Sequence, residues 1–108
     1  MRHITFAGTV VRDERQLDGS RHLEVVGEIG DSEVALYVVV DHDGELAEAD
    51  MTLELDGEPE SVAFEGDSGL VDWDDMRFTL TSEHFALDAR PRQDGDLDMR
   101  LVVRGANP

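Results

Sequence analysis

Residues 84–104 read HFALDARPRQDGDLDMRLVVR, and this stretch decides which fold class the sequence favours. Apolar side chains alternate with polar ones from Phe85 to Ala89, and again from Leu97 to Val103. Such alternation is typical of a strand with one buried face and one solvated face. Asp94-Gly95 lies between the two runs and favours a hairpin turn that suits antiparallel strands. The stretch therefore predicts a β-hairpin.

Alternation with a period of two residues continues through most of the remaining chain. The alternating runs are Ile4–Val10, Leu23–Ile29, Met51–Asp56 and Phe78–Leu80, with a shorter strand expected over Val62–Phe64 and a further one near Leu70–Trp73. The turn pairs that separate such runs are Asp18-Gly19, Gly30-Asp31, Asp43-Gly44 and Asp56-Gly57. Seven to eight short strands joined by hairpins predict an all-β fold, either an antiparallel β-sandwich or a small barrel. Only Gly44–Ala49 has helical character.

Residues 34–40, VALYVVV, are apolar on both faces of the predicted strand. This pattern predicts a central strand that is covered on both sides. The expected core consists of the inward side chains of the runs: Ile4, Phe6, Leu23, Val25, Val34, Leu36, Val38, Met51, Leu53, Phe78, Leu80, Phe85, Leu87, Leu97, Met99 and Leu101.

The chain has 108 residues, enough for one domain and too few for a second full core. We therefore expect residues 1–108 to form a single acidic all-β domain. The sequence has no cysteine, which excludes a disulfide scaffold, a Cys-ligated zinc site and thiol catalysis. The longest apolar run is too short to cross a bilayer, and no signal-peptide core follows the first residues. A cytoplasmic location without membrane contact is expected.

The charge is unusual in both size and distribution. Asp and Glu total 26 against 9 Arg and Lys, for a formal net charge of -17. Residues 22–76 hold no Arg or Lys, so the excess of acids lies in the middle half of the chain. This charge disfavours nucleic acid and anionic lipid as partners. Mutual repulsion of the carboxylates predicts that salt or mild acidification stabilises the fold.

No group of residues indicates catalysis or a bound cofactor. The four histidines lack the i,i+2 or i,i+4 pairing of a zinc or iron site, so no metal site is predicted. Asp94, Asp96 and Asp98 have calcium-like spacing without the closing Glu of an EF-hand, which leaves only weak calcium binding open. The absence of lysine excludes Schiff-base chemistry, and the serines lack the setting of a nucleophile. An enzyme is not expected.

The acidic middle of the chain carries the predicted partner-binding site. Its residues are Asp41, Asp43, Glu45, Glu65, Asp67, Asp72, Trp73, Asp74 and Asp75. Trp73 is ringed by acids, which is typical of an aromatic anchor at a protein interface. The alternative is that its ring caps one end of the core.

These features predict a small acidic protein-binding domain with a basic protein as its partner. It would act as an inhibitor or neutraliser of immunity-protein or DNA-mimic type, because enzymes that act on nucleic acid carry basic clefts that a rigid acidic domain can occlude. One alternative is a structural or assembly module, of phage or secretion-system type, with a halophilic-like, salt-adapted surface. A further alternative is a small-ligand-binding β-barrel with Tyr37 and other aromatics at its mouth.

Overall fold

The computed structural model describes residues 2–64 and 71–104, and every regular element in these ranges is a β-strand. The strands are β1 (Arg2–Arg15), β2 (Arg21–Ile29), β3 (Ser32–Val40), β4 (Leu46–Leu55), β5 (Glu58–Phe64), β6 (Val71–Asp72), β7 (Arg77–Thr81), β8 (Phe85–Pro91) and β9 (Leu97–Val103). In the described ranges, no helix has the length and apolar character needed to span a membrane. The predicted all-β class is confirmed.

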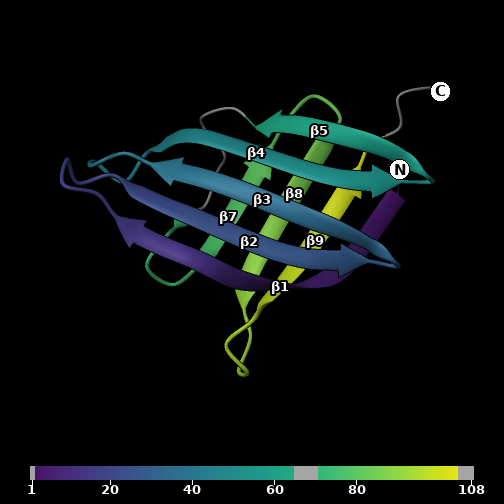
Figure 1. Cartoon of the computed structure of the whole chain (residues 1–108), viewed down its shortest axis with the longest axis horizontal. Helices are drawn as coiled ribbons and strands as arrows, with labels where there is room; N and C mark the ends of the chain where they lie inside the picture. Colours follow the sequence, from purple (N-terminus) through teal and green to yellow (C-terminus); the bar gives the residue numbers. More distant parts are fainter. Residues whose placement is uncertain (1, 65–70, 105–108) are drawn as a thin grey trace.

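All nine strands belong to one sheet, in the spatial order β5-β4-β3-β2-β1-β9-β8-β7-β6. Each pair of neighbouring strands is antiparallel, and β1 joins the two halves of the sheet by pairing with β9. The strands β5 and β6 stand at the two ends. The sheet curls into a half-barrel, so that β1–β5 cross in front of β7, β8 and β9 (Figure 1). The core lies between these two halves.

The inward side chains build the core largely as the alternation predicts. Most of the expected residues are buried, whereas Ile4, Phe6 and Phe85 are partly buried and pack against the core. The buried side chains that the pattern did not include are Val40, Ala49, Val62, Phe64, Trp73 and Ala89. Most of these lie near strand ends, where the curl of the sheet brings one half over the other.

The five predicted turns all join consecutive strands, so the hairpin prediction is confirmed. Asp56 and Gly57 have φ values of 53° and 83°, and Leu55 pairs with Glu58 on either side of them. Positive φ at both central residues is the geometry of a type I′ turn, which matches the twist of the flanking strands. Gly44–Ala49, the one candidate for a helical turn, forms no helix, because β4 begins at Leu46 and pairs with β3 from there.

A β-bulge changes the phase of β1. Val10 pairs with Val25 and Arg12 with Glu24, so Val11 is an extra residue without a partner on β2 and is exposed. A bulge shifts the alternation of the residues that follow it by one. The result appears at the end of β1, where Asp13 pairs with the buried Leu23 and shares its face of the sheet.

Candidate functional site: an acidic outer sheet face

The convex side of β2, β3 and β4 is a patch of twelve side chains that we call the outer face. Its residues, read in strand order, are His22, Glu24, Val26 and Glu28, then Glu33, Ala35, Tyr37 and Val39, then Glu48, Asp50, Thr52 and Glu54. They alternate along each strand with the buried core residues, which places them on the opposite side of the sheet. Six of the twelve are acids, and none is Arg or Lys.

The centre of the outer face is apolar. Ala35, Tyr37 and Val39 of β3 are each half-buried, and Val26 of β2 pairs with Ala35 beside them. The prediction that residues 34–40 are covered on both sides is therefore wrong for this side. Neighbouring side chains within the sheet shield these residues in part, and no described strand crosses over them.

Tyr37 is held in place by a hydrogen bond to its neighbour on β2. The Tyr37 hydroxyl lies 2.8 Å from Nδ1 of His22, and the two rings meet edge to face with centroids 6.0 Å apart. Glu24 and Asp50 are the residues that pair with Tyr37 on either side. A fixed aromatic ring thus stands between two carboxylates.

The ion pairs of the described residues lie elsewhere. They are Arg2–Asp56 (3.0 Å), Arg12–Glu14 (3.1 Å), Arg15–Asp74 (3.6 Å), Arg21–Asp13 (2.8 Å), Arg21–Asp74 (3.4 Å), His42–Asp43 (3.5 Å), Arg90–Asp88 (3.3 Å) and Arg92–Asp94 (3.6 Å). The six acids of the outer face take part in none of them. The hydrogen bond from Arg12 to Glu14 raises the pKa of Arg12 and engages the arginine of β1 that is nearest to this face.

The acids predicted from the sequence gather at a different place, around the turns at one end of the sheet. Asp41, Asp43, Asp72 and Asp74 line a hollow of about 370 Å³ together with Trp73. Glu45 and Asp75 are exposed residues of the same two turns. Two further predicted residues, Glu65 and Asp67, lie outside the described residues. The structure therefore brings together two segments that are about thirty residues apart in the sequence.

Two arginines that the sequence did not suggest also line this hollow. Arg21 donates two hydrogen bonds to Asp13, from Nε to Oδ1 and from Nη2 to Oδ2, each 2.8 Å long. It also donates to the carbonyl oxygen of Trp73 at 3.2 Å and approaches Asp74, to which Arg15 is paired as well. The hydrogen bond from Arg21 lowers the pKa of Asp13. Part of the negative charge at this end is therefore neutralised.

Trp73 lies in the core and leaves little of its ring at the surface. Only 7% of the residue is exposed, its Nε1 donates to the carbonyl of Gly44 at 3.1 Å, and its ring packs on Phe78 with centroids 5.0 Å apart. An anchor for a partner needs accessible apolar surface. The burial of Trp73 favours the alternative interpretation, in which the ring caps one end of the core.

Several predicted acids stabilise their own turns. Oδ1 of Asp41 accepts hydrogen bonds from the backbone N–H groups of Asp43 and Glu45, and Oδ1 of Asp72 accepts one from Asp75. In the β8–β9 turn, Asp94 accepts a hydrogen bond from the N–H of Asp96 in the same way. These bonds explain the abundance of Asp in the turns. Within residues 2–64 and 71–104, no three acidic or histidine side chains come close enough to hold a metal ion.

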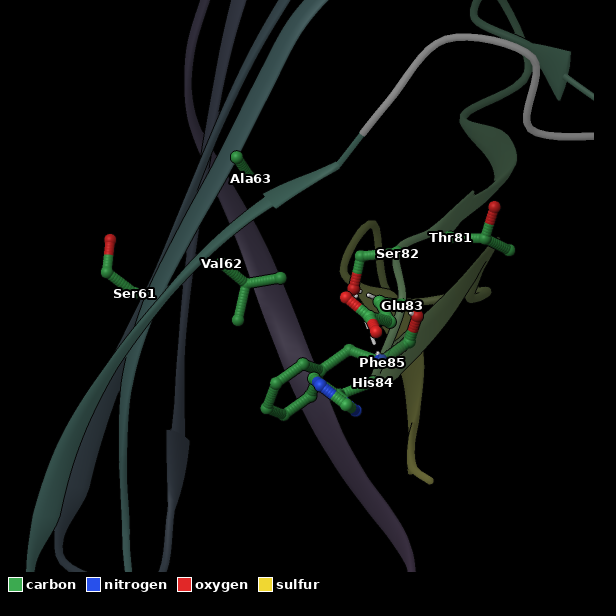
Figure 2. A pocket seen from close by; sticks show the side chains of 8 residues that line it. All are labelled: Ser61, Val62, Ala63, Thr81, Ser82, Glu83, His84 and Phe85. Atoms are coloured by element: carbon green, nitrogen blue, oxygen red, sulfur yellow. Dashed lines mark hydrogen bonds between the residues drawn. The ribbon is translucent and has the colours of Figure 1, made fainter. Parts of the chain in front are cut away.

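A second hollow, of about 540 Å³, lies between β5 and the turn that joins β7 to β8. Figure 2 shows Val62 on one wall and the Phe85 ring on the other, with Glu83 and His84 at the rim. Thr81 and Ser82 complete the second wall. No sequence signal pointed to this groove, because its walls come from strands that do not pair.

Comparison with protein-family models, curated proteins and solved structures finds no match to this chain. The function is therefore argued from the geometry of the described residues.

The unpaired acids of the outer face lead to a prediction for salt. They repel one another across neighbouring strands, and raising NaCl from 0.1 to 1 M shortens the screening length from about 10 to about 3 Å. We expect the melting temperature to rise by about 5 °C, which for a domain of this size corresponds to about 1 kcal/mol. Differential scanning calorimetry measures it. A melting temperature that does not change with NaCl would contradict the repulsion.

Proposed function

We propose that this protein binds a basic surface of another protein through its outer face, as an inhibitor or neutraliser. The observation that carries the proposal is the half-exposed apolar centre, Val26, Ala35, Tyr37 and Val39, inside a ring of carboxylates that have no ion-pair partner among the described residues. Protein interfaces commonly combine an apolar, aromatic-rich centre with a polar rim. Here the rim carries six carboxylates, and Arg12 of β1, which lies opposite Glu24, is already bonded to Glu14. The excess of negative charge favours a partner with the opposite sign.

Each part of the outer face has its own role in binding. The six acids create a negative potential that speeds the encounter with a basic protein at low salt. The apolar centre then governs dissociation, because Tyr37 is held by His22 and loses little freedom when it is buried. A basic cleft that binds nucleic acid offers this combination of positive charge and accessible surface. That chemistry supports an immunity-protein or DNA-mimic type of inhibitor.

The sequence-based site is not the surface on which the proposal rests. Asp74 is paired with Arg15 and Arg21, and Trp73 is buried. Glu45 and Asp75 at the same end remain exposed and still add to the negative potential. The experiment below therefore compares the two acidic surfaces directly.

The test uses two variants with the same change in net charge. The first reverses three acids of the outer face, by Glu24→Arg, Glu48→Arg and Asp50→Arg. The second reverses three acids of the turns, by Asp43→Arg, Glu45→Arg and Asp75→Arg. Capture from a lysate of the native host at moderate salt identifies the basic partner, and surface plasmon resonance with the purified partner gives the rate constants.

We expect the association rate constant of the outer-face variant to be lower than that of the unchanged protein by a factor of about ten or more. The association rate constant of the turn variant should fall much less. Tyr37→Ala should raise the dissociation rate while it leaves the salt dependence of association in place. The proposal is wrong if the two triple variants are impaired equally, since net charge alone would then explain binding. Failure to capture any basic protein would instead favour an acidic coat adapted to salt, as in the assembly-module alternative.

A further inference from the structure

The hydrogen-bonded ladder of the sheet is broken at one place, between β5 and the strands β6 and β7. Among the described residues β5 pairs only with β4, and β6 covers no more of β7 than Arg77 and Phe78. The other edge of β5 is therefore a row of backbone N–H and C=O groups without a strand beside it. Such an edge is a template for pairing with a further strand.

The groove of Figure 2 runs along this break. Ser61 and Ala63 of β5 are exposed, whereas Val62 between them points into the groove toward the half-buried ring of Phe85. The volume of about 540 Å³ lies within the range of sites that hold small ligands or short segments of chain. Among the described residues, the groove thus combines a strand edge without a neighbouring strand and the partly exposed ring of Phe85, whereas Val62 is buried beneath them.

The wall opposite β5 is fixed by its own hydrogen bonds. The N–H of Ser82 donates to the carbonyl of Phe85 at 2.8 Å, and the N–H of Phe85 donates to Oγ of Ser82 at 3.2 Å. The N–H of Arg104, just after β9, donates to the carbonyl of His84 at 2.8 Å. These bonds hold the turn in place opposite β5.

The rim of the groove is acidic. Glu83 is exposed on one side, and Glu58 and Glu60 are exposed on β5. None of the three takes part in an ion pair within residues 2–64 and 71–104. Pro59 has no N–H and weakens pairing at the start of β5, which leaves Glu60–Phe64 as the part of the edge that can pair. Five residues of strand span about 17 Å.

We propose that this groove binds an extended, basic segment of a partner protein, which adds to β5 as a further strand. Main-chain hydrogen bonds to β5 would supply affinity, small apolar side chains would lie on the half-buried ring of Phe85, and Arg or Lys on the segment would face Glu60 and Glu83. The occupant is a strand because only main chain can satisfy a row of alternating donors and acceptors. It is basic because Glu83 in the groove and the exposed Glu60 beside it on β5 have no ion-pair partner among the described residues. A second copy of this chain fits less well, because its β5 carries Glu58 and Glu60 and no cation that could neutralise Glu60 and Glu83.

This inference goes beyond the proposed function, since the groove lies on a different strand pair from the outer face. Its test needs no native partner. The probe is an acetylated and amidated nine-residue peptide, Thr-Val-Thr-Arg-Thr-Val-Thr-Arg-Thr, whose Val and Arg side chains share one face, as those of Val62 and Glu60 do on β5. Two further peptides carry N-methyl groups on alternate amides, one along each edge of the extended chain. N-methylation removes hydrogen-bond donors and leaves charge and side chains unchanged.

We expect the unmodified peptide to bind at a single site in isothermal titration calorimetry at 0.15 M NaCl. Methylation along the edge that faces β5 should weaken binding about tenfold or more, and methylation along the other edge should change it less than about twofold. Amide chemical shifts should move at Ser61–Ala63. Glu83→Arg should weaken binding about threefold, whereas the matched variant Glu33→Arg on the outer face should leave it unchanged.

Equal binding of both methylated peptides would overturn the inference, because the peptide would then be held by charge alone. Loss of binding in Glu33→Arg with none in Glu83→Arg would overturn it too, by placing the peptide on the outer face. So would a dimer formed through β5, detected by sedimentation of the free protein and by shift changes at Ser61–Ala63 that depend on protein concentration. None of these results bears on the partner capture that tests the outer face.

Discussion

Val38→Asp is expected to leave the protein without a folded population at 25 °C. Val38 is 0% exposed and pairs with Leu23 on β2 and Ala49 on β4, both also buried. A carboxylate there has no cation within the core, and burying an unpaired charge costs several kcal/mol. That cost is comparable with the whole stability of a typical domain, about 5–15 kcal/mol. Far-ultraviolet circular dichroism and urea titration measure the result.

The matched control is Val39→Asp, one residue further along the same strand. Val39 lies on the outer face and is half-buried, so a carboxylate at this position keeps contact with water. We expect this variant to fold and to lose about 1 kcal/mol of unfolding free energy, partly through repulsion from the acids around it. If both variants unfold, or neither does, the assignment of the two faces of β3 is wrong. Both variants replace valine by aspartate, so a difference between them reports which face of β3 is buried.

Most of the fold follows from local signals. Alternation with a period of two reports which side of a strand is buried, and Asp-Gly pairs report where the chain reverses. Both signals depend on near neighbours in the sequence, which is why the β8–β9 hairpin around Asp94-Gly95 is where it was expected. The pairing of β1 with β9 has no such signal. It joins the two ends of the described chain, and alternation does not show which strands meet.

One error has a clear physical cause. The run at residues 34–40 is apolar on both faces, but apolar character alone does not show whether a second layer covers a strand. The bulge at Val11 is a separate feature that the sequence does not indicate, because Val10-Val11-Arg12 contains no glycine or proline. Because of the bulge, Asp13 lies on the core side of β1, opposite to the position that simple alternation gives.

The candidate site was predictable in its charge and not in its location. The acidic middle segment without cations is visible in the sequence itself. It could not show that Arg21 reaches Trp73 and Asp74 across 52 and 53 residues. It also could not show which acids build turns and which have no structural role. Asp41 and Asp72 accept backbone hydrogen bonds in their own turns, whereas the side chains of Glu48 and Asp50 make no hydrogen bond or ion pair with the described residues. The proposed outer face is built from side chains of this second kind.

Arg21→Met is expected to lower the free energy of unfolding by about 2 kcal/mol at pH 7, since hydrogen bonds to charged groups contribute about 1.5–3 kcal/mol. The Arg21 side chain is only 12% exposed and makes two hydrogen bonds with Asp13 and one with the Trp73 carbonyl. Methionine keeps much of the aliphatic volume and removes these bonds. Arg15→Met is the matched control. Arg15 is 70% exposed and lies 3.6 Å from Asp74, so its loss should cost less than about 0.5 kcal/mol.

The pH dependence separates the loss of this ion pair from a simple loss of packing. Arg21 lowers the pKa of Asp13 in the folded protein, so the stability that the pair contributes is fully present above the unfolded pKa of about 3.9. That contribution is lost as the pH falls through the lowered, folded pKa. Urea unfolding at pH 7 and pH 2.5 should therefore show a large gap between the unchanged protein and Arg21→Met at pH 7, and a smaller gap at pH 2.5. A gap that is the same at both pH values would show that Arg21 acts by packing, and that its pairing with Asp13 does not hold this end of the sheet together.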